Sequence, residues 1–262
     1  MIISGKYYHM EISWLKIVRL LLLKLYALFS RMLDVFRYLP RRLGRLIEHV
    51  QLGMQSFWSN SIQSLFKFQT MQGIVYWWLE MILMTLECLG LAEVFESIMD
   101  FVKFNSRPLN SWEKELAYSV FGDSINYDRV RIDELAFVGP RQKMFCYVSF
   151  YMINSWGNMQ NSTLLHELVH VWQFEHLGIS YIPRALSAQN TVMGYNYGGV
   201  SQLKSYYEEG KSIRDFNMEQ QADIITDYYR IKNGYRPQWG NAGIIDLPIY
   251  EYFASELKKV YT

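Results

Sequence analysis

The sequence predicts an α+β fold with two parts. Residues 1–105 are expected to form a mostly helical, basic N-terminal region, and residues 106–262 a domain with a short sheet and a motif-bearing helix. Three observations lead to this prediction. Apolar residues recur at helical spacing through the first hundred residues, a polar stretch with a proline follows, and β-branched and aromatic segments then precede a His-Glu-x-x-His pattern.

The composition is that of a globular protein. The chain has 262 residues, of which 50% are apolar and 19% charged, enough for one large domain or two modest ones. Cys88 and Cys146 are too few for a disulfide framework and wrongly spaced for a cysteine-rich metal site. The sequence contains no motif of a nucleic-acid-binding module, so nucleic acid is not an expected partner.

The N-terminal region is expected to consist of helices. Polar residues return at helical spacing from Ile12 to Leu39, which predicts an amphipathic helix that ends near Pro40. Further helices are expected from Arg41 past Val50, over 61–89 and over 92–104.

The net charge of +1 conceals a basic N-terminus, because residues 1–49 hold nine Lys or Arg against Glu11, Asp34 and Glu48. One interpretation is a helical bundle whose charged arc is simply solvated. The other is peripheral attachment of residues 1–104 to a membrane surface, since wide apolar faces bordered by basic residues and Trp suit the headgroup boundary. A delivery apparatus is a further candidate partner.

Neither apolar stretch predicts a membrane span. Arg19 and Lys24 interrupt residues 17–29, and Glu80 interrupts residues 68–86, so the uncharged runs are shorter than the roughly 18–20 residues that cross a bilayer. Charges inside the first stretch and the lack of a cleavage site also argue against a signal peptide. We expect a cytoplasmic protein, or one exported without such a peptide, with peripheral membrane contact as an option.

The composition changes at residues 105–111, which we interpret as the boundary between the two parts. Residues 129–132 and 144–151 are expected to be strands, separated by a turn at Gly139 and Pro140. The motif helix is expected to be capped by Asn161 or Ser162 and to end just before Gly178.

The His-Glu-x-x-His pattern predicts a metal site. His166 and His170 are four residues apart, so on a helix they differ by about 40° in direction and about 6 Å in height, and both imidazoles can reach one ion. Glu167 lies beside them and is placed to take a proton from a water molecule that the metal activates. The expected metal is Zn²⁺.

A catalytic zinc usually has three protein ligands and one open position. The third expected ligand is Glu219, on a second helix capped by Asn217 and ending near Gly234. Asp223 shares a helix face with Glu219, so it can accept a hydrogen bond from a ligand histidine. An ordinary carboxylate in a first helical turn is the alternative interpretation of Glu219.

The other candidate ligand is His176, ten residues after His166, which is the spacing of the third ligand in the metzincin pattern. That pattern needs a helix-breaking glycine where this chain has Gln173. Without the break, His176 lies about 15 Å further along the helix axis, on a different face. Residues 191–195 resemble a Met-turn, which keeps this option open.

The pattern His166-Glu167-x-x-His170 with a downstream Glu219-x-x-x-Asp223 resembles the gluzincin branch of zincin metallopeptidases. More narrowly, residues 164–173, 194–199 and 216–223 resemble small bacterial zincin-like domains associated with polymorphic-toxin and contractile-injection loci. The resemblance covers residues 112–234. It implies a zincin-like domain that hydrolyses peptide bonds, in a bacterial effector or toxin.

Tyr195 and Tyr197 lie between the two expected metal helices, and their hydroxyls could donate to the oxyanion of a tetrahedral intermediate. Packed loop aromatics are the alternative interpretation of both residues. The function expected from these residues is a zinc-dependent metallopeptidase acting on a peptide or protein substrate. The alternatives are a non-proteolytic zinc hydrolase and a binding or structural module with a vestigial motif.

Overall fold

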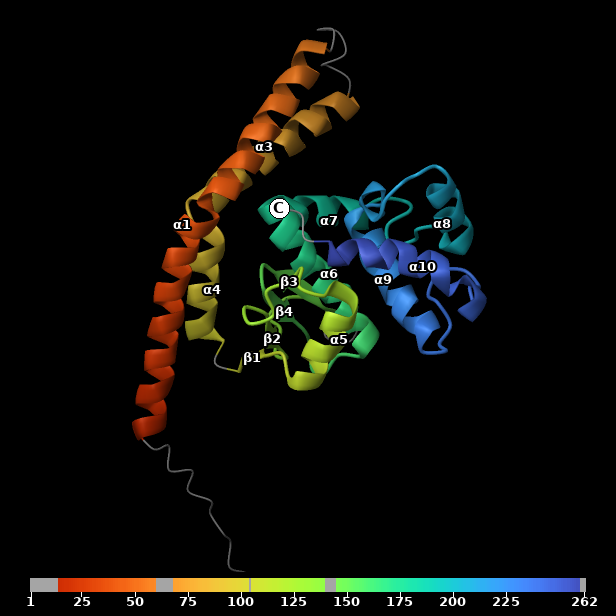
Figure 1. Cartoon of the computed structure of the whole chain (residues 1–262). Helices are drawn as coiled ribbons and strands as arrows, with labels where there is room; N and C mark the ends of the chain where they lie inside the picture. Colours follow the sequence, from red (N-terminus) through yellow and green to blue (C-terminus); the bar gives the residue numbers. More distant parts are fainter. Residues whose placement is uncertain (1–13, 60–67, 104, 140–144, 260–262) are drawn as a thin grey trace, which may run out of the picture.

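The computed structural model describes residues 14–59, 68–103, 105–139 and 145–259. It shows a mixed helix and sheet fold in which long helices come first and a small sheet follows, as predicted. Figure 1 shows the first helices as an elongated group beside a rounded remainder. We call residues 14–102 the arm and residues 105–259 the body.

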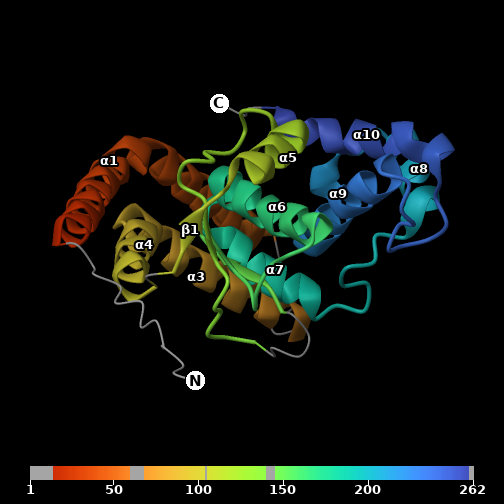
Figure 2. The ribbon, with the colours of Figure 1, turned by 90° about the horizontal axis from the view of Figure 1, so that it is seen from below.

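The arm consists of α1 (Trp14–Ser59), α3 (Phe68–Cys88) and α4 (Leu91–Val102). Both shorter helices pack along α1, and Gly90, with φ of 86°, turns the chain between them. Figure 2 shows the three helices gathered on one side of the body. Among the described helices, none is by itself long and apolar enough to cross a membrane. Residues 71–88 of α3 and helix α4 together reach the required length and apolar composition, but the two segments are bent by 68° relative to each other.

The prediction that a helix ends near Pro40 is wrong, because α1 continues through that residue. Proline removes one helix hydrogen bond and crowds the preceding turn, which normally favours a break. Here ion pairs hold α1 on both sides of the proline: Arg31 binds Asp100 of α4, and Arg45 binds Glu87 of α3. Contacts with neighbouring helices therefore outweigh the local cost of Pro40.

The body contains a four-stranded sheet with the order β1-β2-β4-β3. Its strands are β1 (Arg107–Pro108), β2 (Arg131–Asp133), β3 (Tyr147–Ser149) and β4 (Met152–Asn154). The β2–β4 pair is parallel, and the β1–β2 and β3–β4 pairs are antiparallel. The strand predicted over 144–151 is confirmed only for 147–149, which form β3, because the chain turns at Phe150, with φ of 60°, and returns as β4; residue 144 lies outside the described residues.

The rest of the described body is mostly helical. They are α5 (Ser111–Phe121), α6 (Asn161–Leu177), α7 (Tyr181–Gln189), α8 (Gly199–Glu208), α9 (Met218–Lys232) and α10 (Leu247–Ser255). Short 3₁₀ turns cover 178–180, 213–215, 244–246 and 256–258. The middle of α6 is buried, including Leu165, Leu168 and Val169 with no exposed surface, and it packs against α9. The core of the body therefore fixes α6 and α9 relative to each other.

The ends of α6 and α9 are only partly as predicted. Gln160, not Asn161 or Ser162, precedes the first residue of α6, and the Asn161 amide donates instead to the hydroxyl of Tyr229 on α9. Gly178 follows the last residue of α6, as predicted. Asn217 caps α9 as predicted, because its side chain accepts from the backbone N–H of Glu219 and Gln220.

Charged side chains join the arm to the body. Arg184 of α7 donates two hydrogen bonds to Glu80 of α3, at 2.8 and 2.7 Å. Arg129, which precedes β2, donates to Glu96 of α4 at 3.1 Å. The described chain passes from arm to body between the end of α4 at Val102 and the start of β1 at Arg107.

Candidate metal centre

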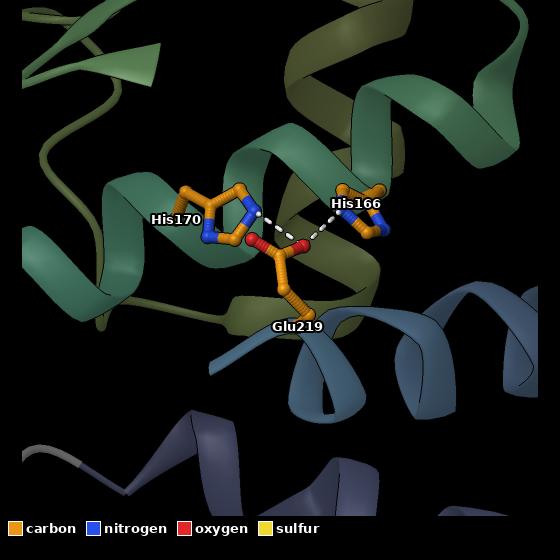
Figure 3. A group of neighbouring side chains, drawn as sticks. All are labelled: His166, His170 and Glu219. Atoms are coloured by element: carbon orange, nitrogen blue, oxygen red, sulfur yellow. Dashed lines mark ion pairs between the residues drawn. The ribbon is translucent and has the colours of Figure 1, made fainter. Parts of the chain in front are cut away.

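Three side chains from two helices converge at one point. The Oε2 atom of Glu219, on α9, lies 3.3 Å from Nε2 of His166 and 3.5 Å from Nε2 of His170, both on α6 (Figure 3). Within the described part of the chain these three residues form a group whose ligand atoms all lie within 4.8 Å of one another. His170 and Glu219 are buried, and His166 is nearly so.

Hydrogen bonds behind His166 fix its orientation. Its Nδ1 atom lies 2.9 Å from Oδ1 of Asp223, the bond that the sequence spacing predicted. The second oxygen of Asp223 accepts from the Trp239 indole at 2.6 Å and from the Gln238 amide at 3.3 Å. Because the Asp223 carboxylate only accepts, Nδ1 of His166 donates and carries the proton.

His170 is oriented in the same way by Gln173, one turn further along α6. Its Nδ1 atom lies 2.8 Å from Oε1 of Gln173. The Gln173 amide nitrogen donates to the Met218 carbonyl and to Gln221, whose own amide donates to the Phe216 carbonyl. These backbone acceptors fix both amides, so Gln173 presents its oxygen and His170 donates from Nδ1.

Three electron-rich atoms therefore lie close together: Nε2 of His166, Nε2 of His170 and Oε2 of Glu219. With protons on both Nδ1 atoms, the neutral histidines direct the lone pairs of Nε2 at the same carboxylate oxygen. In the described chain, Oε2 of Glu219 has no hydrogen-bond donor, whereas its Oε1 accepts from Gln189 at 2.8 Å. This arrangement is stable only with a cation among the three atoms, either a metal ion or a proton on an imidazole.

The pKa values respond to this arrangement. Burial opposes the protonated form of His166, but the carboxylates of Asp223 and Glu219 outweigh it and raise the pKa well above 6.5. For His170, burial is likewise outweighed by the Glu219 carboxylate, which raises the pKa. Burial favours the neutral acid of Glu219, but both histidines overcome this effect and lower its pKa.

Glu167 is buried beside the two histidines. It has 5% of its surface exposed, and in the described chain its Oε2 atom has no hydrogen-bond partner. Burial is the main cause that raises the pKa of Glu167, with Glu219 adding to it and both histidines opposing. A carboxylate with a raised pKa and an unused oxygen is suited to accept a proton from a bound molecule.

A cleft of about 480 Å³ opens over these residues. Tyr195 lines it, with its ring centre 6.1 Å from that of His166. Tyr147 and Val148 of β3 form part of the wall. Tyr197 is placed differently: it is buried, its hydroxyl donates to Asp227 at 2.7 Å, and it is not among the cleft-lining residues.

His176, the alternative ligand, does not join the group. It lies near the end of α6, where its Nδ1 atom is 2.8 Å from the Trp172 carbonyl and its ring stacks on the Trp172 indole at 4.5 Å. Burial is the main cause that lowers its pKa to about 4. The helix continues through Gln173 without a break, as the lack of glycine there predicted.

The sequence patterns do not mark several residues that support the ligands. Gln173 is one of them, although its position three residues after His170 places it on the same helix face. Gln189, Gln238 and Trp239 reach Glu219 and Asp223 from other parts of the chain. Their contacts depend on the tertiary fold, and no local pattern marks them.

The chain is similar in sequence to a bacterial protein. It is 30% identical over 142 residues to the type VI secretion system spike protein VgrG2b of Pseudomonas aeruginosa. The match covers 49% of this chain and 13% of that protein, so the chain spans a small part of its relative's length. No family model and no solved structure matches the chain. The similarity is to a bacterial secretion-system protein, in agreement with the coarser part of the predicted resemblance.

The histidine pKa values give a direct prediction. After chelator treatment, we expect NMR titration to show His166 still protonated well above pH 6.5, whereas His176 titrates near pH 4. The stability contributed by protonated His166 is then present below 6.5 and is lost as the pH rises through its raised pKa. Asp223→Asn should lower the pKa of His166 and leave that of His176 unchanged. Titration of His166 at or below pH 6.5 would contradict this account.

Proposed function

We propose that this protein is a zinc-dependent metallopeptidase whose metal ligands are His166, His170 and Glu219. The observation that carries the proposal is the convergence of two imidazole nitrogens and one carboxylate oxygen, with the histidines held from behind. Two histidines and one glutamate are a ligand set of catalytic zinc, which leaves a fourth position open.

The distances support zinc. Ligand atoms about 2.1 Å from a tetrahedral zinc ion lie roughly 3.4 Å from one another. The separations of Oε2 of Glu219 from the two Nε2 atoms, 3.3 and 3.5 Å, are close to this value. The two separations that Glu219 makes with the histidines therefore support a shared zinc ion.

The residues around the ligands suit hydrolysis. Bound zinc would supply a Lewis acid for a carbonyl oxygen and lower the pKa of a water molecule. Glu167 would take the proton of the attacking water and pass it to the leaving amine. Tyr195 would donate a hydrogen bond to the oxyanion, because its ring stands beside His166 at the cleft wall. Tyr197 has no part in this scheme.

The position of β3 supports a peptide substrate over other hydrolysable groups. This strand is last in the sheet order, and two of its three residues line the cleft next to the motif helix. An extended peptide can align along an edge strand by main-chain hydrogen bonds, with alternate side chains directed into the cleft. Such alignment would bring a peptide bond to Glu167.

The similarity to VgrG2b supports a role as a secreted effector or toxin. The relative is named as a spike protein of a type VI secretion system. We propose that this chain acts together with such an apparatus and that its peptidase activity is the delivered function.

Metal analysis of purified variants tests the ligand set. We expect one zinc ion in the wild type and in His176→Ala, and loss of most zinc in His166→Ala and Glu219→Ala, because each removes one of three ligands. His176→Ala is the matched control, since it removes a histidine from the same helix. Zinc retained by Glu219→Ala and lost by His176→Ala would contradict the assignment.

Glu167→Gln separates metal binding from chemistry. We expect this variant to retain zinc and to lose peptidase activity by at least about a hundredfold, because the amide cannot accept the proton. Glu175→Gln is the matched control, since Glu175 lies on the same helix and its contacts with Tyr151 and Asn126 can be kept by an amide oxygen. Unchanged turnover in Glu167→Gln would favour a vestigial site. Zinc-dependent hydrolysis of esters without cleavage of any peptide would favour a different hydrolase.

A further inference from the structure

The arm has the reverse polarity of a water-soluble helical bundle. Most of its described charged side chains are buried or half-buried between its helices or against the body, whereas many of its large apolar side chains are exposed on the outside. In a bundle surrounded by water the opposite distribution is expected, because apolar surface is driven inward.

The buried charges of the arm form ion pairs. Arg42 of α1 and Glu93 of α4 have 5% and 3% of their surface exposed and lie 2.6 Å apart. Arg45 of α1 pairs with Glu87 of α3 at 2.9 Å. Burial raises the pKa of Glu96, while Arg129 and Arg31 oppose this. Most of these buried charges are therefore paired, although Nε of Arg45 and Oε1 of Glu96 have no hydrogen-bond partner in the described chain.

The exposed apolar residues of α1 form a continuous stripe. At 100° per residue they fall within an arc of about 140° that extends about 54 Å along the helix, and Arg31, Arg42 and Arg45 lie on the opposite side. The stripe, which we call the α1 stripe, comprises Val18, Leu21, Leu22, Leu25, Tyr26, Phe29, Met32, Leu33, Phe36, Leu43, Ile47 and Met54, each at least 42% exposed. Leu23 and Leu52 are exposed outside this arc.

The other two helices of the arm repeat the pattern. On α3, Glu80 and Glu87 are buried while apolar residues are exposed on the opposite side. On α4, Glu93 and Glu96 are buried while apolar residues are exposed. The exposed apolar residues on these faces are Met71, Val75, Trp78, Leu79, Ile82 and Leu86 of α3, and Val94, Ile98, Phe101 and Val102 of α4; Tyr76, 43% exposed, lies on the Glu80 side of α3.

We propose that the arm embeds the α1 stripe in an anionic lipid membrane. Lipid chains provide no hydrogen-bonding partners, so charges of a segment at the membrane must be paired within the protein, as Arg42 and Glu93 are. The exposed Arg19 and Arg37 lie about 20° beyond one edge of the α1 stripe, where long basic side chains can reach anionic headgroups.

The length of the α1 stripe favours an orientation in the plane of the membrane. Its extent of about 54 Å exceeds the roughly 30 Å of the hydrocarbon layer. Among the described helices, none meets the requirement for a span alone. An apolar face of this kind is buried at the boundary of headgroups and acyl chains. The arm then holds the body, and its cleft, at the membrane surface. This inference does not depend on the proposed peptidase activity.

Vesicle flotation of the whole 262-residue chain tests the proposal. The probe is vesicles of equal parts phosphatidylcholine and phosphatidylglycerol, with pure phosphatidylcholine for comparison. The test variant combines Leu25→Glu, Phe29→Glu and Phe36→Glu on the α1 stripe. The matched control combines Trp112→Glu, Tyr207→Glu and Ile245→Glu, which are exposed residues of the body.

We expect wild type and control to float with the anionic vesicles and to bind neutral ones more weakly. Binding by the test variant should fall by about a thousandfold or more, at about tenfold or more for each apolar side chain kept out of lipid. Circular dichroism of the test variant should show the helix content of the wild type. If that variant does not fold, Phe29→Trp replaces it, and brominated acyl chains should quench its tryptophan fluorescence more than that of the wild type.

Three results would overturn the proposal. These are failure of the wild type to bind anionic vesicles, equal binding by the test variant, and binding of a protein partner through the α1 stripe without any vesicle binding. Zinc content and peptidase activity are measured separately, so failure of lipid binding leaves the proposed metal centre intact.

Discussion

The structure of the site depends on one interaction, the meeting of two imidazole lone pairs with a carboxylate oxygen between α6 and α9. Asp223 and Gln173 hold protons on the Nδ1 atoms of His166 and His170. When both histidines are neutral, each Nε2 atom therefore directs a lone pair, not a hydrogen, at Glu219. Electron-rich atoms at this separation repel one another unless a cation lies among them. The buried contact of α6 with α9 therefore supplies a preformed cation site.

Buried charged groups have different partners in the body and in the arm. In the body, Glu167 and Glu219 each keep an oxygen atom without a hydrogen-bond donor in the described chain, which is costly and is typical of a functional site. In the arm, arginines and carboxylates neutralise each other, and the apolar surface faces outward. The unsatisfied carboxylate oxygens suit the ligand proposed for the body, whereas the paired charges under an apolar exterior suit the nonpolar environment proposed for the arm, where Nε of Arg45 and Oε1 of Glu96 also lack a partner.

The sequence predicts the features that depend on neighbouring residues, but not those that depend on residues far apart along the chain. The positions of His166, His170 and Glu219 with Asp223 were predictable, because helical periodicity and an N-cap at Asn217 are local properties. Gln189 and Trp239 were not, because only the tertiary fold brings them to the site. Continuation of α1 through Pro40 and the reversal at Phe150 also depend on contacts distant in sequence. The amphipathic character of the N-terminal helices was visible, but which face is buried was not.

X-ray absorption at the zinc edge tests the proposed metal ligands most directly. For the zinc-loaded protein, we expect a four-coordinate shell of nitrogen and oxygen atoms at about 2.0–2.2 Å, with the scattering of two imidazole rings. Scattering from a third imidazole, from sulfur, or from oxygen atoms alone would contradict the ligand set of His166, His170 and Glu219.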